Sequence, residues 1–136
     1  MPQPFFERLD ASRFRATELT EGPWSPEQQH GGPPSALLAG VLESTAAEED
    51  TEVVRIALDF LAPVPVGEVE VRAEVVRDGR NVQLLAGELS VGGRVCLRAS
   101  AWRLRVRELG AEAPAPESPP ELPDGANDDW ISHIGC

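Results

Sequence analysis

Between Glu52 and Arg107, apolar and polar residues alternate with a period of two, the pattern of strands that bury one face. Turn residues break this alternation three times and leave four segments, at 52–61, 68–77, 81–91 and 94–107. Asp78-Gly79 and Gly92-Gly93 are hairpin signals between consecutive segments. Because tight turns join neighbouring strands, the pattern predicts an antiparallel meander.

The first segment shows how the two faces are predicted. One face carries Val54, Ile56, Leu58 and Phe60, and the other carries Val53, Arg55, Ala57 and Asp59. A shorter alternation at 13–17 predicts one more strand, earlier in the chain.

A single convincing helix is predicted from about Pro34 to Glu48. Its apolar residues cover more than one stripe, which is typical of a helix surrounded by protein rather than laid on a surface. It runs into Glu48-Glu49-Asp50, whose charge opposes the helix dipole, so we expect that end to fray. Strand, helix and four strands in this order predict an α+β fold with an antiparallel sheet curled round one helix.

A Gly/Pro-rich turn, residues 28–35, leads into this helix. Pro33 and Pro34 fit the first helical turn, where a missing N–H costs nothing. Gly31 and Gly32 have no Cβ and let a ligand approach the backbone. Because backbone N–H groups at a helix start are free and lie at the positive end of its dipole, the turn is suited to polarise a carbonyl or hold an anion.

Composition limits the class of protein. A chain of 136 residues with 41% hydrophobic residues predicts one domain with a real core. The net charge of −11 argues against nucleic acid as the main partner. Neither an apolar run of the roughly 18 residues that a membrane span needs nor a signal peptide is evident, so we expect a cytoplasmic protein. Two cysteines, Cys96 and Cys136, form no metal-ligand pattern, and we expect free thiols and no cofactor.

Residues 111–136 differ from the rest of the chain. They are rich in Pro, Glu and Ala, show no periodicity, and carry six acidic residues and no basic one. We therefore assign 1–110 to the folded domain and 111–136 to an acidic, Pro-rich linker or tail.

Several pieces at this spacing resemble the hotdog fold of acyl-CoA thioesterases, and more narrowly the N-terminal half of the bacterial double-hotdog thioesterase-like proteins. The pieces are Gly22-Pro23-Trp24-Ser25, His30-Gly31-Gly32-Pro33-Pro34-Ser35-Ala36-Leu37-Leu38, residues 59–67, residues 78–84 and residues 98–105. They span nearly all of residues 1–110. The resemblance implies an acyl-CoA or acyl-carrier thioester as substrate and a place in fatty acid metabolism.

The resemblance also implies that hotdogs work in pairs, with active sites between them. A second hotdog would begin about where this chain ends, so we expect 111–136 to lead toward a missing half. An isolated hotdog exposes the sheet edge that normally pairs, so a homodimer or pairing with a second hotdog is expected.

Thioester hydrolysis needs a donor for the developing oxyanion and an activated water. The backbone N–H of Gly31 or Gly32 is the candidate donor. His30 is a candidate either to orient the turn or to contact the acyl group, and Trp24 is either a packing anchor or a wall of the pocket. Arg80 is the first candidate for the phosphates of coenzyme A, with Arg103, Arg105 and Arg107 as others or as a solvated strand face.

The general base is harder to find. The family patterns place an acid nine residues after the histidine or five before the Phe of Phe-x-x-Pro, and these positions hold Ala39 and Arg55. Glu43 is the remaining candidate base on the helix, and Asp59 is more simply an exposed strand acid.

Two alternatives to a thioesterase remain open. A non-catalytic half that binds acyl groups or completes a pseudo-dimer fits the missing acid. An enoyl-CoA hydratase ranks lower, because that chemistry needs an Asp beside His30. An active hydrolase is the preferred interpretation, with weak or no activity expected from an isolated half.

Overall fold

The computed structural model describes residues 3–108, 110 and 117–121. Most of the predicted tail, together with Cys136, lies outside these residues. The elements are β1 (Phe6–Arg8), β2 (Arg13–Ala16), a 3-10 turn η1 (Glu18–Thr20), α1 (Gly32–Ser44), β3 (Thr51–Phe60), β4 (Glu68–Asp78), β5 (Val82–Val91) and β6 (Arg94–Arg105). All five predicted strands are present, and β1 is an additional short one.

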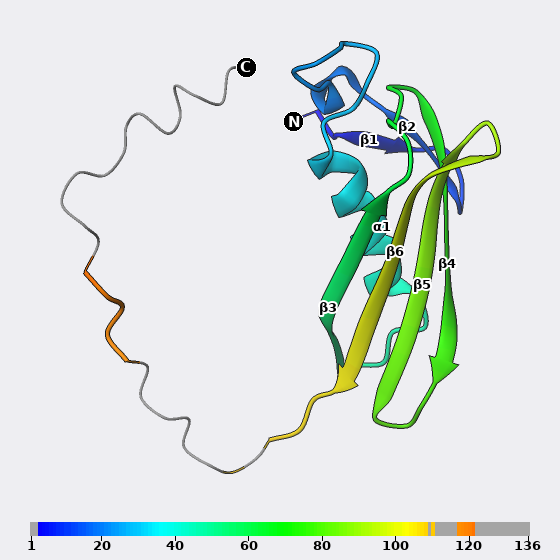
Figure 1. The fold of residues 1–136 in the computed structure, drawn as a ribbon. Coiled ribbons are helices and arrows are strands. Elements are labelled where there is room, and N and C mark those ends of the chain that lie inside the picture. Colours follow the sequence, from blue (N-terminus) through cyan, green and yellow to red (C-terminus); the bar gives the residue numbers. More distant parts are fainter. Residues whose placement is uncertain (1–2, 109, 111–116, 122–136) are drawn as a thin grey trace.

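The strands form one antiparallel sheet in the order β1-β2-β4-β5-β6-β3 (Figure 1). Both predicted hairpins form, since β4 pairs with β5 and β5 with β6 along the chain. β3 crosses to the far side and pairs with β6, which makes it an edge strand. The predicted antiparallel meander is therefore confirmed, and it leaves one ten-residue edge without a partner among the described residues.

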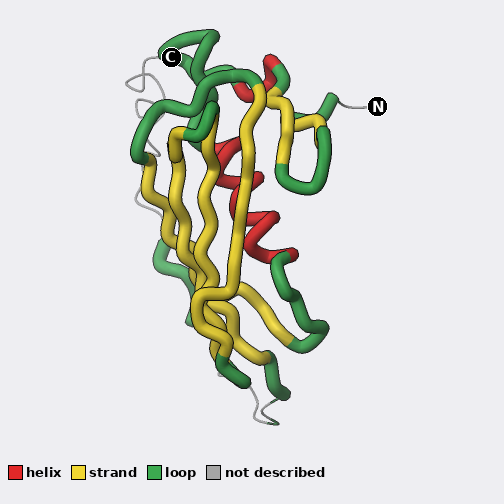
Figure 2. Tube along the Cα trace, turned by 90° about the vertical axis from the view of Figure 1, so that its right-hand side faces the viewer, coloured by secondary structure: helices red, strands yellow, loops and turns green. Residues whose placement is uncertain are grey.

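Helix α1 lies against one face of the sheet, and together they form two layers (Figure 2). The helix contributes Leu38 and Leu42, both fully buried. They join a core that includes Leu85, Leu89 and Leu97 from β5 and β6. Burying a leucine side chain stabilises a fold by about 1.5–3 kcal/mol, so this cluster is what holds the helix to the sheet.

Gly87, in the middle of β5, sets how closely the helix approaches. A Cβ added there would lie 2.9 Å from Leu38 Cδ1 and 3.2 Å from Leu42 Cδ2. The absence of a side chain at this position lets the helix settle onto the sheet.

The side of α1 that faces away from the sheet is open among the described residues, apart from Phe5 and Phe6 near its N-terminal end. Gly32, Ala36, Gly40 and Glu43, which follow one another at helical spacing, are exposed there. The predicted fold is thus confirmed as an antiparallel sheet with a single helix, but within one chain the sheet covers only one side of that helix.

The predicted faces of β3 need one correction, at Val54. A β-bulge shifts the register between Val53 and Arg55, so that Val54 is an extra residue in the pairing with β6. As a result Val53 packs against the core with Ile56 and Leu58, whereas Val54 is 55% exposed. Strict alternation predicts the wrong residue here because a bulge reverses the side-chain sequence.

The helix ends four residues earlier than predicted, at Ser44. Thr45 closes the last turn through its N–H and its hydroxyl, which both donate to the carbonyl of Val41. Ala46 then adopts a left-handed conformation with φ of 48° and turns the chain away. The acidic run at 48–50 therefore lies outside the helix, where Arg105 pairs with Glu48 and Asp50.

Arg103 caps this end of the helix from inside the protein. Its side chain is 2% exposed, and its two terminal nitrogens donate to four backbone carbonyls and one side chain. These acceptors are Leu42 O (2.9 Å), Glu43 O (2.9 Å), Thr45 O (2.8 Å), Ala46 O (3.1 Å) and Gln83 Oε1 (3.2 Å). The guanidinium thus satisfies carbonyls that a helix end leaves unpaired and complements the dipole.

Candidate functional site

The Gly/Pro-rich turn lies at the opposite end of α1, where β1 and β2 also lie (Figure 1). Two buried polar residues, Thr20 and Gln29, hold it in place. His30 N–H donates to Thr20 O at 2.7 Å, and Gln29 N–H donates to Val64 O at 2.8 Å. The turn is thereby fixed to η1 on one side and to the segment before β4 on the other.

Only one backbone N–H remains free in this turn. The N–H of Gly32 donates to Nδ1 of His30 at 3.1 Å, Pro33 and Pro34 have no N–H, and the N–H of Ser35 donates to Gly31 O. The N–H of Gly31 has no acceptor among the described residues. Of the two predicted donors, the structure therefore leaves Gly31 open and occupies Gly32.

Three aromatic rings lie in or beside this part of the turn. The rings of Trp24 and His30 are stacked, with centroids 6.1 Å apart and planes 4° apart. The ring of Phe60 lies over Gly31, since a Cβ added to that glycine would be 3.2 Å from Phe60 Cζ. Trp24 is 76% exposed and Phe60 51% exposed. Exposed aromatic rings around one unpaired donor are typical of a ligand site rather than of a core.

A family model identifies the domain that carries this turn. The family model described as the acyl-CoA thioesterase N-terminal domain matches residues 20–104, from η1 to the end of β6. The chain belongs to this family. The match includes the turn, the helix and the four long strands, so the resemblance read from the sequence is confirmed. No curated protein matches the chain.

Solved structures show the same fold. A phenylacetic acid degradation-related protein of Ralstonia eutropha JMP134, classed as a thioesterase, is 28% identical over 73% of this chain and 82% of its own, with a TM-score of 0.57. A Bacillus halodurans protein solved with CoA is 15% identical over 69% of both chains, with a TM-score of 0.60.

A third structure differs in length. A protein of Thermobifida fusca YX classed as a thioesterase II is 19% identical over 87% of this chain, with a TM-score of 0.64, but the match covers only 43% of that protein. This acyl-CoA thioesterase domain therefore spans less than half of that neighbour.

The predicted carboxylates lie away from the turn of this thioesterase domain. Glu43 is exposed near the other end of α1, twelve residues and therefore about 18 Å along the helix axis from Gly31. Asp59 precedes Phe60 in β3, and because side chains alternate in a strand it points to the other face of the sheet. Neither forms a hydrogen bond with residues of the turn. The role of Glu43 as a base remains a prediction.

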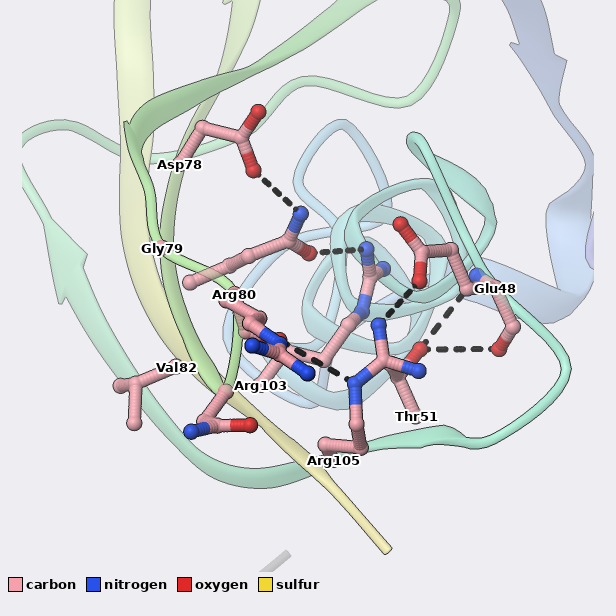
Figure 3. A pocket seen from close by; sticks show the side chains of 10 residues that line it. Glu48, Thr51, Asp78, Gly79, Arg80, Val82, Arg103 and Arg105 are labelled. Carbon is pink, nitrogen blue, oxygen red and sulfur yellow. Dashed lines mark hydrogen bonds and ion pairs between the residues drawn. The ribbon is translucent and has the colours of Figure 1, made fainter.

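Arg80 is also separate from the turn. It lines a small polar cavity of about 50 Å³ beyond the C-terminal end of α1, with Glu48, Asp78, Arg103 and Arg105 among its neighbours (Figure 3). Arg80 is exposed, and its guanidinium has no hydrogen-bond partner within the described part of the chain. It is therefore available to an anion, though not beside the aromatic rings.

The other predicted phosphate ligands are engaged within the protein. Arg105 pairs with Glu48 and Asp50, and the hydrogen bonds to these carboxylates raise the pKa of its guanidinium further above the ordinary value. Arg107 donates to Asn81 Oδ1 at 2.9 Å. With Arg103 buried against the helix end, Arg80 is the best remaining candidate of the four. No helix in the described part of the chain is both long and apolar enough to cross a membrane.

The sequence reasoning missed Phe60 as a site residue. The strand pattern groups Phe60 with Ile56 and Leu58 on one face, but nothing in it indicates that the Phe60 ring reaches a glycine 29 positions earlier. A usable signal was the pair of small residues at the helix start, since a glycine there leaves space that another side chain can fill.

Proposed function

We propose that this domain binds an acyl-CoA thioester with the thioester carbonyl against the N–H of Gly31, and that it hydrolyses the ester when paired with a second hotdog. The observation that carries the proposal is the single unpaired N–H at a helix start, set among exposed aromatic rings. A donor at this position stabilises negative charge that develops on the carbonyl oxygen, which is the main requirement of acyl transfer.

His30 has a positioning role in this proposal. Because its Nδ1 accepts the N–H of Gly32, the neutral ring carries its proton on Nε2, which is free to face a ligand. The stack with Trp24 keeps the ring in this orientation. Without His30, two N–H groups would compete for the carbonyl and the turn would lose one of its internal hydrogen bonds.

The chemistry needs one group that the turn does not contain. Water must add to the carbonyl carbon and lose a proton to a base, after which the C–S bond breaks and coenzyme A leaves as a thiol. No carboxylate hydrogen-bonds to the turn in the described part of this chain. We therefore assign the base to the paired hotdog, with Glu43 as the candidate on this chain if pairing brings a partner's turn near it.

The free edge of β3 supports pairing. Its ten residues bond to β6 on one side only, and an edge of this length is an exposed template for another strand. The Thermobifida fusca neighbour has more than twice the matched length, which is consistent with a second domain of similar size. We propose a homodimer, or a second hotdog, against this edge and a cytoplasmic setting for the reaction.

Coenzyme A is the proposed carrier, and Arg80 is its proposed phosphate contact. The solved Bacillus halodurans neighbour contains CoA and shares the fold. An exposed guanidinium without an internal partner suits a phosphate, because a guanidinium donates two parallel hydrogen bonds to it.

A second candidate function is a non-catalytic acyl-binding half. The observation that favours it is the lack of an acid at Ala39 and Arg55, together with the distance of Glu43 from the turn. This alternative keeps the binding role of Gly31 and omits hydrolysis.

The test compares Gly31→Pro with Gly31→Ala. Proline removes the N–H and fits the observed φ of −62°, whereas alanine keeps the N–H. Both place a Cβ near Phe60, so the pair differs chiefly in the donor. Thiol release from acyl-CoA esters is expected to fall about 10²–10³-fold in Gly31→Pro and only a few-fold in Gly31→Ala.

Binding separates the two candidate functions. If the wild-type chain forms a dimer and binds acyl-CoA, measured calorimetrically, but releases no thiol, the non-catalytic half is correct. Equal activity of the proline and alanine variants would contradict the role of Gly31, and neither binding nor turnover would contradict both functions.

A further inference from the structure

An apolar groove of about 310 Å³ begins at the glycine turn and is not explained by the fold. It is lined by Phe5, Phe6, Gly32, Pro33, Ala36 and Leu37. No charged residue lines it. Gly32 belongs both to this groove and to the turn, so the groove starts one residue from the free N–H of Gly31.

The floor of the groove is one face of α1. Gly32 and Ala36 are four residues apart, as are Pro33 and Leu37, so the two pairs lie side by side on the first turns of the helix. Gly32 and Ala36 are small and exposed, which leaves open space above the helix where larger residues would fill it. The open face of α1 is therefore hollow at the end nearest the donor.

The wall of the groove is the segment before β1, and it is held in place. Phe5 O accepts the N–H of Thr17 at 2.9 Å, and Pro4 O accepts the Thr17 hydroxyl at 2.9 Å. Phe6 pairs with Ala16 across β1 and β2. Even so, Phe5 remains 52% exposed. A phenyl ring fixed over an apolar hollow and still half open to solvent indicates a surface that an apolar ligand completes.

We propose that this groove binds the acyl chain of the thioester, an inference that rests on the proposed function. With the carbonyl at Gly31 N–H, the chain attached to it can enter at Gly32 and run along Ala36 between Phe5 and the helix. The pantetheine amides and the nucleotide of coenzyme A would leave polar groups unpaired on such a lining, whereas a hydrocarbon chain would not.

The groove volume limits the chain. At about 30 Å³ for each group the size of a water molecule, 310 Å³ holds on the order of ten non-hydrogen atoms. A chain with about eight to ten carbons buried fills the groove, so a medium-chain acyl-CoA is the substrate class that gains most from it.

The experiment measures binding of non-hydrolysable S-(2-oxoalkyl)-CoA thioethers, which keep a carbonyl for Gly31 N–H, with chains from three to sixteen carbons, to the full 136-residue chain. Affinity is expected to rise about fourfold for each methylene that is buried and to level off near ten carbons. Thioethers remove the need for turnover, so the result does not depend on the missing base.

Ala36→Leu and Ala47→Leu form a matched pair of variants. Ala36 lines the groove, and Ala47 is exposed beyond the other end of the helix and lines none of the cavities described. Ala36→Leu adds three carbons to the groove and is expected to weaken the 2-oxodecyl ligand on the order of 50-fold while leaving the 2-oxopropyl ligand unchanged. Ala47→Leu is expected to leave the whole series unchanged.

Phe5→Ala gives an independent test from the opposite wall. It keeps the backbone bonds of Phe5 and is expected to weaken long chains more than short ones. Affinity that does not depend on chain length, or that changes equally in the two leucine variants, would overturn the groove assignment and leave the proposed function standing. If no thioether binds, the groove assignment and the proposed function are both wrong. If Ala36→Leu alone changes the oligomeric state, the groove is instead occupied by a second copy of the chain.

Discussion

The two ends of α1 differ in whether the backbone groups that lack a partner within the helix find one elsewhere in the protein. At the C-terminal end, Arg103 and Thr45 donate hydrogen bonds to the carbonyls of Val41, Leu42 and Glu43. The guanidinium of Arg103 is buried. At the N-terminal end, one N–H, that of Gly31, is left without an acceptor among the described residues. One end stabilises the helix, and the other leaves a donor for a ligand.

This contrast shows that the same helix property serves stability or function according to what covers it. Every helix leaves N–H and C=O groups unpaired at its ends. A buried end must be satisfied from within the protein, because an unpaired polar group there costs about 1–3 kcal/mol. An exposed end can keep one group free at little cost, since water replaces the ligand when none is bound.

The largest expected effect is at the buried end. Arg103→Met has a similar volume but leaves four carbonyls without their donor, so the free energy of unfolding is expected to fall by about 3–5 kcal/mol in urea denaturation. Arg98→Met is the control on the same strand, because Arg98 is exposed and, among the described residues, pairs only with Glu88. Its expected cost is about 0–1 kcal/mol. Similar costs in the two variants would remove the contrast between the helix ends.

Alanine substitutions of glycines on the two sides of α1 should change the free energy of unfolding in opposite directions. Gly87→Ala presses a Cβ against Leu38 and is expected to cost about 1–3 kcal/mol through overpacking. Gly40→Ala meets no atom within 4 Å and is expected to stabilise by up to about 1 kcal/mol through helix propensity. Thermal unfolding measures both. A destabilising Gly40→Ala would show that a second hotdog covers the open side of the helix.

Substitutions of His30 test how the exposed end of α1 contributes to thiol release. His30→Ala removes the acceptor for Gly32 N–H and the stack with Trp24, and thiol release is expected to fall about tenfold, as for lost orientation worth about 1.4 kcal/mol. His30→Asn is expected to recover part of this loss, because an asparagine oxygen accepts the N–H two residues on. Equal loss in both variants would instead assign the effect to the Nε2 proton or to the ring itself.

The smallest effect is expected at Asp10, which caps a turn in solvent as Arg103 caps a helix in the core. Hydrogen bonds from the N–H groups of Ser12 and Arg13, together with the Arg13 side chain, lower the pKa of Asp10 from 3.8 to about 2. Because the folded pKa is the lower one, this contribution to stability is present above about pH 4 and is lost as the pH falls to about 2.

Asp10→Asn should therefore lower the free energy of unfolding slightly at pH 5 and leave it unchanged near pH 2. Urea midpoints at the two pH values measure this, with Asp59→Asn as the control, since Asp59 accepts no hydrogen bond within the described residues. A constant difference between wild type and Asp10→Asn at both pH values would contradict the assignment.

Local features of the site could be predicted from the sequence. Trp24, His30, Gly31 and Gly32 lie within nine residues of one another, and the turn that brings them together depends on its own glycines and prolines. The choice of Gly31 over Gly32 could not be predicted in this way, because it depends on where the His30 ring points.

Contacts between distant residues could not be predicted. Phe60 reaches Gly31, Arg103 reaches Leu42, and Phe5 faces Ala36, each across a long stretch of chain. The sequence predicts Arg103 either as a phosphate ligand or as part of a solvated strand face, because an arginine is rarely buried. The alternation of β6 places Arg103 on the buried face with Ala99 and Ala101, and only the structure shows that the carbonyls of the helix end receive its guanidinium.

The sequence by itself determined the antiparallel meander, the single helix and the glycine turn, because period-two alternation, apolar helical spacing and turn residues act over a few neighbours. The tertiary structure decided the bulge at Val54, the early helix end, the buried cap and the one free N–H. Those features depend on which groups come into contact when the helix packs against the sheet. Residues far apart in the sequence form a hydrogen bond or a steric contact only when packing brings them together.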